Sequence, residues 1–295
     1  MRQVLYETSQ RVFTRCACAQ RTGFLINFFN QESVSESDHK SGEVCAEPTK
    51  QAAPRRSVVR VYFPARHRTL AYYNDRFDLR QGDLVFVDGK LEGKQGRVEE
   101  VSYNFRIRLS DYQRVIAVAD TAVHGRFYAA GSHFITFDRN ALPAQKAVTW
   151  FLPPRKPEDE FACGADDAVF PLRELKEMKV TYAVAERGHD YYCRNLVRYI
   201  SLDGHKGFAI VEGTSPYEVE FTCKNGEIGQ LTCSCFCGEH CKHEFAVMLQ
   251  LKDIMEQIEK KFKADYRRGD YFAAVCKETL MDYAVDSRDD GAFTL

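Results

Sequence analysis

The sequence predicts an α+β fold, in which a small antiparallel β-barrel near the N-terminus precedes a β-hairpin and helix module with a helical C-terminal tail. Two observations carry this prediction. Short β-branched and aromatic stretches recur about every ten residues over residues 57–125, with Gly and Asp between them, which is typical of a small barrel or sandwich. Further along, an Asn-Gly turn joins two short strands, and an uninterrupted helical pattern begins a few residues after them.

The composition indicates a soluble, globular chain. Its 295 residues are 44% hydrophobic and 28% charged, which is enough for one large domain or two modest ones. Lys and Arg number 41 and Asp and Glu 42, so the formal net charge of −1 excludes a protein that coats nucleic acid by charge alone. Apolar runs are too short for a membrane-spanning helix, so we expect no membrane partner. The 11 cysteines are an odd number, which excludes a fully paired disulfide framework.

The first 56 residues differ in composition from the rest. Residues 30–56 are rich in Ser, Glu, Lys and Ala, and they hold too few large apolar side chains to offset the entropy of ordering. The first stretch with strand character begins at Val58. We therefore expect residues 1–56 to be a disordered extension.

Residues 57–125 contain the strands of the expected barrel. Six stretches have strand character: 58–63, 70–73, 83–87, 96–101, 105–109 and 115–118. Within them, Gly82–Lys90 followed by Gly93–Val98 resembles the KOW motif of ribosomal and transcription-elongation proteins. Arg106 and Arg108 would share one strand face with Arg97 nearby, which makes this face either a solvated surface or a nucleic-acid surface.

Residues 126–186 are predicted to connect the barrel to the next module. Arg155–Asp167 is acidic and rich in proline, as exposed linkers often are. Trp150, the only tryptophan, precedes this linker in a short apolar run, and we expect it to pack in the core. Residues 172–178 could form a short helix.

The most informative part of the chain is a crowded group of cysteines between a hairpin and a helix. Residues 217–221 alternate apolar and acidic, and Asn225-Gly226 predicts a type I′ turn. The return strand, residues 228–232, leads directly into Cys233. A helical pattern with neither Gly nor Pro then runs over residues 241–262.

Four residues of this group suit a metal ion: Cys233, Cys235, Cys241 and His243. The first two sulfurs can face one point at the end of a strand, and the other two residues lie where the chain turns back into a helix. Three thiolates and an imidazole fit a closed tetrahedral site, so we expect one structural Zn²⁺ per chain. A shifted pair, Cys235 and Cys237, stays open as an alternative, and His240 is a further alternative ligand.

The order C-x-C, a short spacer and C-x-H before an apolar helix resembles the SWIM-type zinc finger. The resemblance covers residues 187–252 and includes the upstream strand pattern at residues 207–213 and 217–219. It implies the same four ligands and a role in binding DNA or protein. The spacer departs from the family pattern, because Cys237 and His240 are two extra candidate ligands. Cys237 is either a bystander or a redox-sensitive thiol beside the metal.

Residues 253–295 are expected to form the helical tail. The helix that follows the cysteines continues through Lys252–Phe262, and a second amphipathic helix spans Asp270–Tyr283. A group of basic residues between the two helices gives either a solvated face or a phosphate contact. This group is Lys260, Lys261, Lys263, Arg267 and Arg268.

These features together predict a non-enzymatic zinc-binding protein of the cytoplasm. The sequence lacks the common nucleotide-binding, metalloprotease and nucleophile-elbow motifs, and no small-molecule substrate is evident. The leading hypothesis is association with nucleic acid, DNA before RNA. The alternatives are a protein–protein interaction adaptor of a DNA-acting complex and a thiol-based zinc redox sensor. Closely spaced thiols without a secretion signal favour a reducing compartment.

Overall fold

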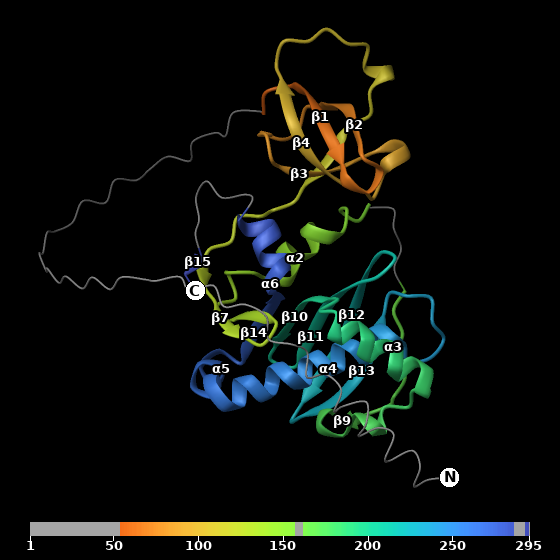
Figure 1. Ribbon diagram of the computed structural model, residues 1–295, viewed down its shortest axis with the longest axis vertical. Helices are drawn as coiled ribbons and strands as arrows, with labels where there is room; N and C mark the ends of the chain where they lie inside the picture. Colours follow the sequence, from red (N-terminus) through yellow and green to blue (C-terminus); the bar gives the residue numbers. More distant parts are fainter. Residues whose placement is uncertain (1–53, 157–161, 286–292, 295) are drawn as a thin grey trace, which may run out of the picture. The chain divides into compact units, whose positions relative to one another are not determined.

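The computed structural model describes residues 54–156, 162–285 and 293–294, so most of the expected N-terminal extension lies outside the described residues. Those residues form two antiparallel sheets, of five and eight strands, together with several helices (Figure 1). The mixed α+β class predicted from the sequence is confirmed. Among the described residues, no helix combines the length and the apolar character needed to cross a membrane.

The first sheet holds five of the six predicted strands, but it is not a closed barrel, and that prediction was wrong. Its edge strands are joined by one isolated bridge between Tyr73 and Arg114 rather than by a ladder. Short 3₁₀ turns connect the strands at Pro64–Arg66, Gly89–Leu91 and Leu109–Asp111. In sheet order the strands are β2 (Arg68–Asn74), β1 (Ser57–Phe63), β4 (Gln95–Ser102), β3 (Leu84–Val87) and β5 (Val115–Val118).

The sixth predicted strand, residues 105–109, is absent. Residues 105–108 have no regular structure, although Phe105 packs edge-on against Tyr73. The edge of β2 that such a strand would need is already used, because the Tyr73 amide donates to the Gln113 carbonyl. Arg106 and Arg108 therefore do not share a strand face.

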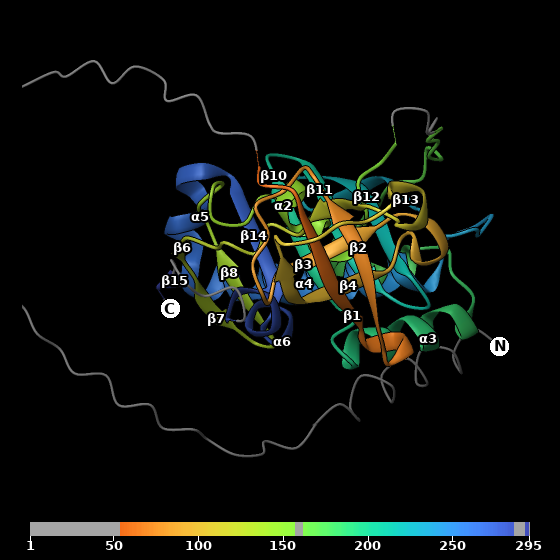
Figure 2. The same cartoon turned by 90° about the horizontal axis from the view of Figure 1, so that it is seen from above.

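The second sheet collects strands from three distant parts of the chain. Figure 2 shows β14, β10, β11, β12 and β13 following one another across the sheet. A separate short parallel pair joins β6 (Gly125–Arg126) to β15 (Phe293–Thr294). In sheet order the eight strands are β7 (Tyr128–Ala130), β8 (His133–Thr136), β14 (Tyr271–Cys276), β10 (Val197–Asp203), β11 (Lys206–Glu212), β12 (Pro216–Lys224), β13 (Glu227–Cys233) and β9 (Phe170–Pro171).

Strand β14 replaces the beginning of the second helix that the sequence predicts at residues 270–283. All six of its residues are buried, with Phe272 and Ala274 in the core on one face of the sheet and Ala273 and Val275 in the core on the other. A strand covered on both faces is apolar throughout, so it lacks the alternation that marks a half-buried strand. In the described part of the chain, the helical structure after β14 is short: α6 (Lys277–Leu280) with a π-helical turn at Met281–Val285.

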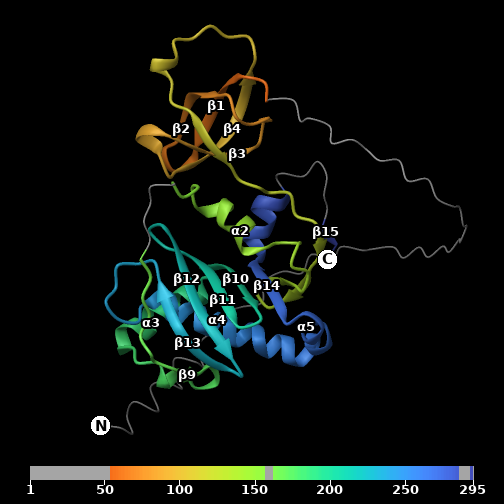
Figure 3. The same cartoon turned by 180° about the vertical axis from the view of Figure 1, so that it is seen from behind.

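The longest helix among the described residues, α4 (Lys242–Gln257), covers one face of the larger sheet. It packs against β10, β12 and β13, which lie in front of it in the view of Figure 3. Ten of its residues are buried, so this helix supplies much of the core on that side. The other helical segments are α2 (Ala144–Phe151), a 3₁₀ helix at Leu172–Glu177, α3 (Tyr182–Cys193), a π-helical segment at Ile258–Phe262 and α5 (Lys263–Gly269).

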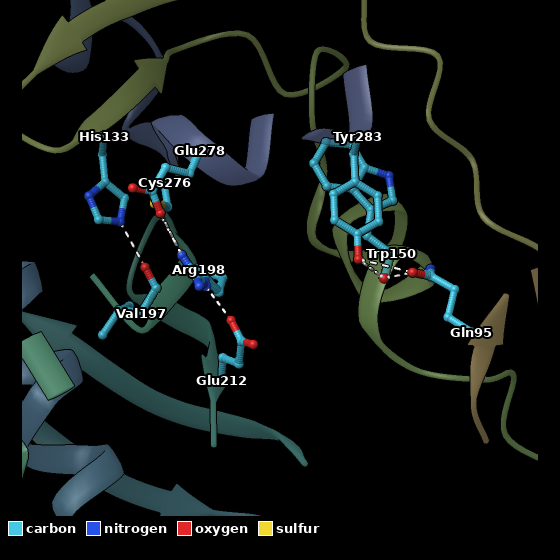
Figure 4. A network of polar contacts seen from close by, with 9 residues as sticks. All are labelled: Gln95, His133, Trp150, Val197, Arg198, Glu212, Cys276, Glu278 and Tyr283. Atoms are coloured by element: carbon cyan, nitrogen blue, oxygen red, sulfur yellow. Dashed lines mark hydrogen bonds and ion pairs between the residues drawn. The ribbon is translucent and has the colours of Figure 1, made fainter. Parts of the chain in front are cut away.

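Two clusters of polar contacts lie on the face of the larger sheet opposite α4 (Figure 4). Arg198 on β10 donates to Glu212 on β11 at 2.5 Å and to Glu278 on α6 at 3.5 Å. Trp150 is fully buried, as the sequence predicts, and the ring of Tyr283 stacks on it at 5.0 Å between centroids. These contacts tie the helical segment after β14 to the sheet and to α2.

Candidate metal centre

The β12–β13 hairpin delivers the first two cysteines of the cluster. Asn225 and Gly226 have φ values of 52° and 82°, which a type I′ turn requires, so the predicted turn is confirmed. Strand β13 ends at Cys233. The pairing continues one residue further, because the Ser234 amide donates to the Glu218 carbonyl at 2.9 Å and the Glu218 amide donates to the Ser234 hydroxyl at 2.9 Å. This extension fixes the chain between Cys233 and Cys235.

The start of α4 delivers the other two residues. Cys241 is the N-cap of the helix, and its sulfur accepts a hydrogen bond from the Glu244 amide at 3.5 Å. In return, the Glu244 carboxylate accepts from the Cys241 amide at 2.9 Å, which completes a capping box. A thiolate at this position also interacts favourably with the positive end of the helix dipole. The same turn places His243 beside Cys241.

The four side chains converge on one point. Their ligand atoms all lie within 4.8 Å of one another, and the sulfurs of Cys233 and Cys241 are each 3.7 Å from His243 Nδ1. Tetrahedral zinc, with Zn–S near 2.3 Å and Zn–N near 2.0 Å, separates its ligand atoms by about 3.5–3.8 Å. The spacing therefore suits a metal ion of this size. The cluster is Cys233, Cys235, Cys241 and His243.

Aromatic rings fix the orientation of His243. The ring of Tyr217 stacks on the imidazole at 4.1 Å with an interplanar angle of 19°, and Tyr191 meets it edge-on at 5.4 Å. Nδ1 faces the sulfurs, while Nε2 is buried without a hydrogen-bond partner among the described residues. Metal-bound histidines commonly donate their second nitrogen to a carboxylate or carbonyl. Here ring packing holds the imidazole instead.

The thiols of the cluster differ in acidity because they share protons. Hydrogen bonds, first from the Cys233 thiol and then from His243 and the Glu244 amide, lower the pKa of Cys241 to about 4. The hydrogen bond that Cys233 gives to Cys241, together with burial, raises the pKa of Cys233. Burial raises the pKa of Cys235 to about 12. A cation bound here would hold all three as thiolates, and its binding would release the protons of Cys233 and Cys235.

Compared with known proteins, the chain matches no protein-family model, no curated protein and no solved structure. The resemblance to SWIM-type zinc fingers therefore stays a prediction from the motif.

The two alternative ligands lie outside this cluster. Cys237 is exposed, in the loop that joins Cys235 to Cys241. His240 is half-buried and turns toward the Glu244 carboxylate, 3.0 Å away, rather than toward the sulfurs. The cluster thus includes the Cys233/Cys235 pair and leaves out Cys237.

The basic residues singled out in the sequence are dispersed, and many of them face acids. Arg108 is paired with Asp111 and Lys260 with Glu256. Arg97 lies on β4, in the middle of the smaller sheet. Lys263 is paired with Glu259 and Arg268 with Asp265. Within the described part of the chain, three of the predicted residues form no ion pair: Arg106, Lys261 and Arg267.

Two features of the site are missing from the sequence interpretation. Glu244 contacts Cys241 and His240, and the Cys-x-x-Glu spacing of a capping box with cysteine as the cap could have indicated it. Phe236, between Cys235 and Cys237, is completely exposed. A phenylalanine side chain is usually expected to be buried, and nothing in the sequence around Phe236 indicates that it is exposed.

Proposed function

We propose that the Cys₃His cluster binds one zinc ion and that this zinc is structural. The observation that carries the proposal is the convergence of three thiols and one imidazole, whose ligand atoms all lie within 4.8 Å of one another. Four protein ligands complete the coordination of zinc, so no position is left for a substrate or an activated water. The ion supplies charge neutralisation for three thiolates, and it adds its binding free energy to that of folding.

Within this proposal, the metal links the end of β13 to the start of α4. The thiolates of Cys233 and Cys235 come from the end of the hairpin. Cys241 and His243 complete the site from the start of the helix. Because α4 contributes seven residues to the hydrophobic core, fixing its first turn stabilises more than the loop itself. The loop between Cys235 and Cys241 is then held at both ends.

We further propose that this module acts in nucleic-acid association. Phe236 supports the proposal, because a fully exposed aromatic ring on a loop held at both ends can stack on an unpaired base. Among the described residues, Arg106, Lys261 and Arg267 form no ion pair, so their charges can contact phosphates. The resemblance to SWIM-type fingers also supports nucleic-acid association.

A second candidate function is protein–protein association. It is favoured by the pairing of four of the eight predicted basic residues with neighbouring acids and by the formal net charge of −1. The fully exposed Phe236 side chain also suits the apolar pocket of a protein partner. The two candidates differ in their dependence on salt, since phosphate contacts release counterions and apolar contacts do not.

Fluorescence anisotropy of the full-length, zinc-quantified protein tests the first candidate against the second. The probes are labelled single-stranded DNA, duplex DNA and RNA at two salt concentrations, with and without a chelator. We expect binding to a single-stranded probe that weakens with salt and with chelation. The variant Phe236→Ala should lose affinity, while Phe236→Tyr should keep it. Absence of binding at low salt by protein that contains one zinc per chain would contradict nucleic-acid association and favour a protein partner.

A further inference from the structure

Glu244 is a buried carboxylate beside the metal cluster that is not one of its ligands. The residue is only 5% exposed, on the first turn of α4. One of its oxygens, Oε2, accepts two hydrogen bonds, from the Cys241 amide at 2.9 Å and from His240 Nδ1 at 3.0 Å. A carboxylate is costly to bury unless hydrogen bonds satisfy it, so this arrangement is a specific feature of the site.

Both partners of Glu244 belong to the segment that carries the third ligand. Cys241 is held on its backbone by the carboxylate and on its sulfur by the Glu244 amide, so its position is fixed at both ends. His240 is one residue earlier, and its side chain is 11% exposed. Its ring meets Phe170 of β9 edge-on at 6.4 Å, which anchors the pair to the edge of the sheet.

We propose that Glu244 and His240 form an outer layer of the metal centre, in which Glu244 positions the Cys241 thiolate and His240 positions Glu244. This inference rests on the proposed zinc site. It assigns His240 a role different from that of the alternative ligand suggested by the sequence. Neither residue donates an electron pair to the metal, and both act through the backbone and side chain of Cys241.

The physical effect is preorganisation of one ligand. Cys241 has an extended backbone, with φ −108° and ψ 171°, and the next residue is helical, so its sulfur direction depends on this single junction. Without the carboxylate, the buried Cys241 amide loses its acceptor and the junction can rotate. Loss of outer-layer partners typically weakens metal binding about 10- to 100-fold.

The experiment measures zinc affinity of the full-length protein by competition with a chromophoric chelator, and the absorption spectrum of the Co²⁺ form. The variants are Glu244→Ala, Glu244→Gln and His240→Ala. Glu239→Ala is the matched control, since Glu239 is an exposed carboxylate of the same loop. Thermal unfolding of each metal-free variant separates a change of affinity from a general loss of stability.

We expect Glu244→Ala to weaken zinc binding about 10- to 100-fold. Glu244→Gln should remain close to wild type, because the amide oxygen still accepts both hydrogen bonds. His240→Ala should weaken binding by a smaller factor and leave the Co²⁺ spectrum of three thiolates and one imidazole unchanged. Glu239→Ala should have no effect. If Glu244→Ala does not fold, His240→Ala still tests the proposal.

Three results would overturn the proposal. These are unchanged zinc affinity in both Glu244→Ala and His240→Ala, equal losses in Glu244→Gln and Glu244→Ala, or a Co²⁺ spectrum that loses its imidazole contribution in His240→Ala. The last result would make His240 a ligand. A wild-type protein that binds neither Zn²⁺ nor Co²⁺ would instead contradict the proposed function on which this inference rests.

Discussion

Acidification should destabilise the larger sheet through His133, a fully buried histidine on β8. Its Nε2–H donates to the Val197 carbonyl at 2.8 Å (Figure 4). Its Nδ1 lies 3.0 Å from the Ser132 hydroxyl. Burial lowers the pKa of His133 to about 4, and the nearby charges of Arg198 and Lys277 act in the same direction. The folded protein therefore keeps this imidazole neutral well below the pH at which the unfolded chain takes up a proton.

The sign and size of the effect follow from this difference. The unfolded histidine binds a proton below about pH 6.5, whereas the folded one does so only near pH 4. Stability is therefore complete above pH 6.5 and falls as the pH drops toward 4. At about 1.4 kcal/mol for each pH unit, the full difference amounts to about 3 kcal/mol.

Urea denaturation of the wild type and of His133→Gln between pH 7 and pH 4.5 measures this contribution. Glutamine can still donate to the Val197 carbonyl but does not titrate, so other acid-sensitive groups, the thiolates included, affect both proteins alike. We expect the wild type to lose about 2 kcal/mol more than the variant over this range. Parallel pH dependences in the two proteins would refute the assignment of this effect to His133.

Two further predictions concern the ligand register and the packing of the sheet. Cys237→Ser should retain one zinc per chain and Cys233→Ser should not, as measured by elemental analysis of the purified proteins; the reverse result would favour the shifted Cys235/Cys237 pair. Gly207→Ala should lower the free energy of unfolding by about 1–3 kcal/mol, because its added Cβ would lie 2.1 Å from the Phe221 ring. Gly164→Ala, with no atom within 4 Å of the added Cβ, is the matched control, and equal unfolding curves for the two variants would show that the sheet relaxes around Gly207.

Local signals in the sequence were sufficient for the hairpin and the helix of the metal centre. The turn at Asn225-Gly226 needs positive φ at both positions, and few residue pairs other than Asn-Gly accept this, so the turn could be predicted without knowing its surroundings. The helix after Cys241 has no interrupting Gly or Pro, so its existence could be predicted, although residues 243–251 are all buried and not only those on one face.

The missed elements depend on partners that are distant in the sequence. Strand β14 lies between β8 and β10, and its apolar residues alone do not distinguish a strand buried on both faces from a buried helix. Residues 105–109 alternate like a strand, but they have no free sheet edge to pair with, since Gln113 already occupies the edge at Tyr73. Closure of the smaller sheet into a barrel likewise depends on pairing between its edge strands, β2 and β5, which a local sequence pattern cannot predict.

The outer layer of the metal centre was hidden for a different reason. Glu244 follows His243 directly, and a glutamate near a helix N-terminus is ordinarily interpreted as a solvated partner of the helix dipole. Only the burial of this carboxylate and its contact with Cys241 distinguish it from such a residue.

The most direct test of the account is the metal content of the full-length protein, purified without added metal or chelator, combined with the absorption spectrum after substitution by Co²⁺. We predict one zinc per chain and a Co²⁺ spectrum with thiolate charge-transfer bands and the intense visible bands of tetrahedral coordination. Removal of the zinc should lower the melting temperature, since metal binding contributes to folding. Protein that is folded and reduced, yet contains no stoichiometric metal and gives no thiolate–Co²⁺ bands, would contradict the central claim.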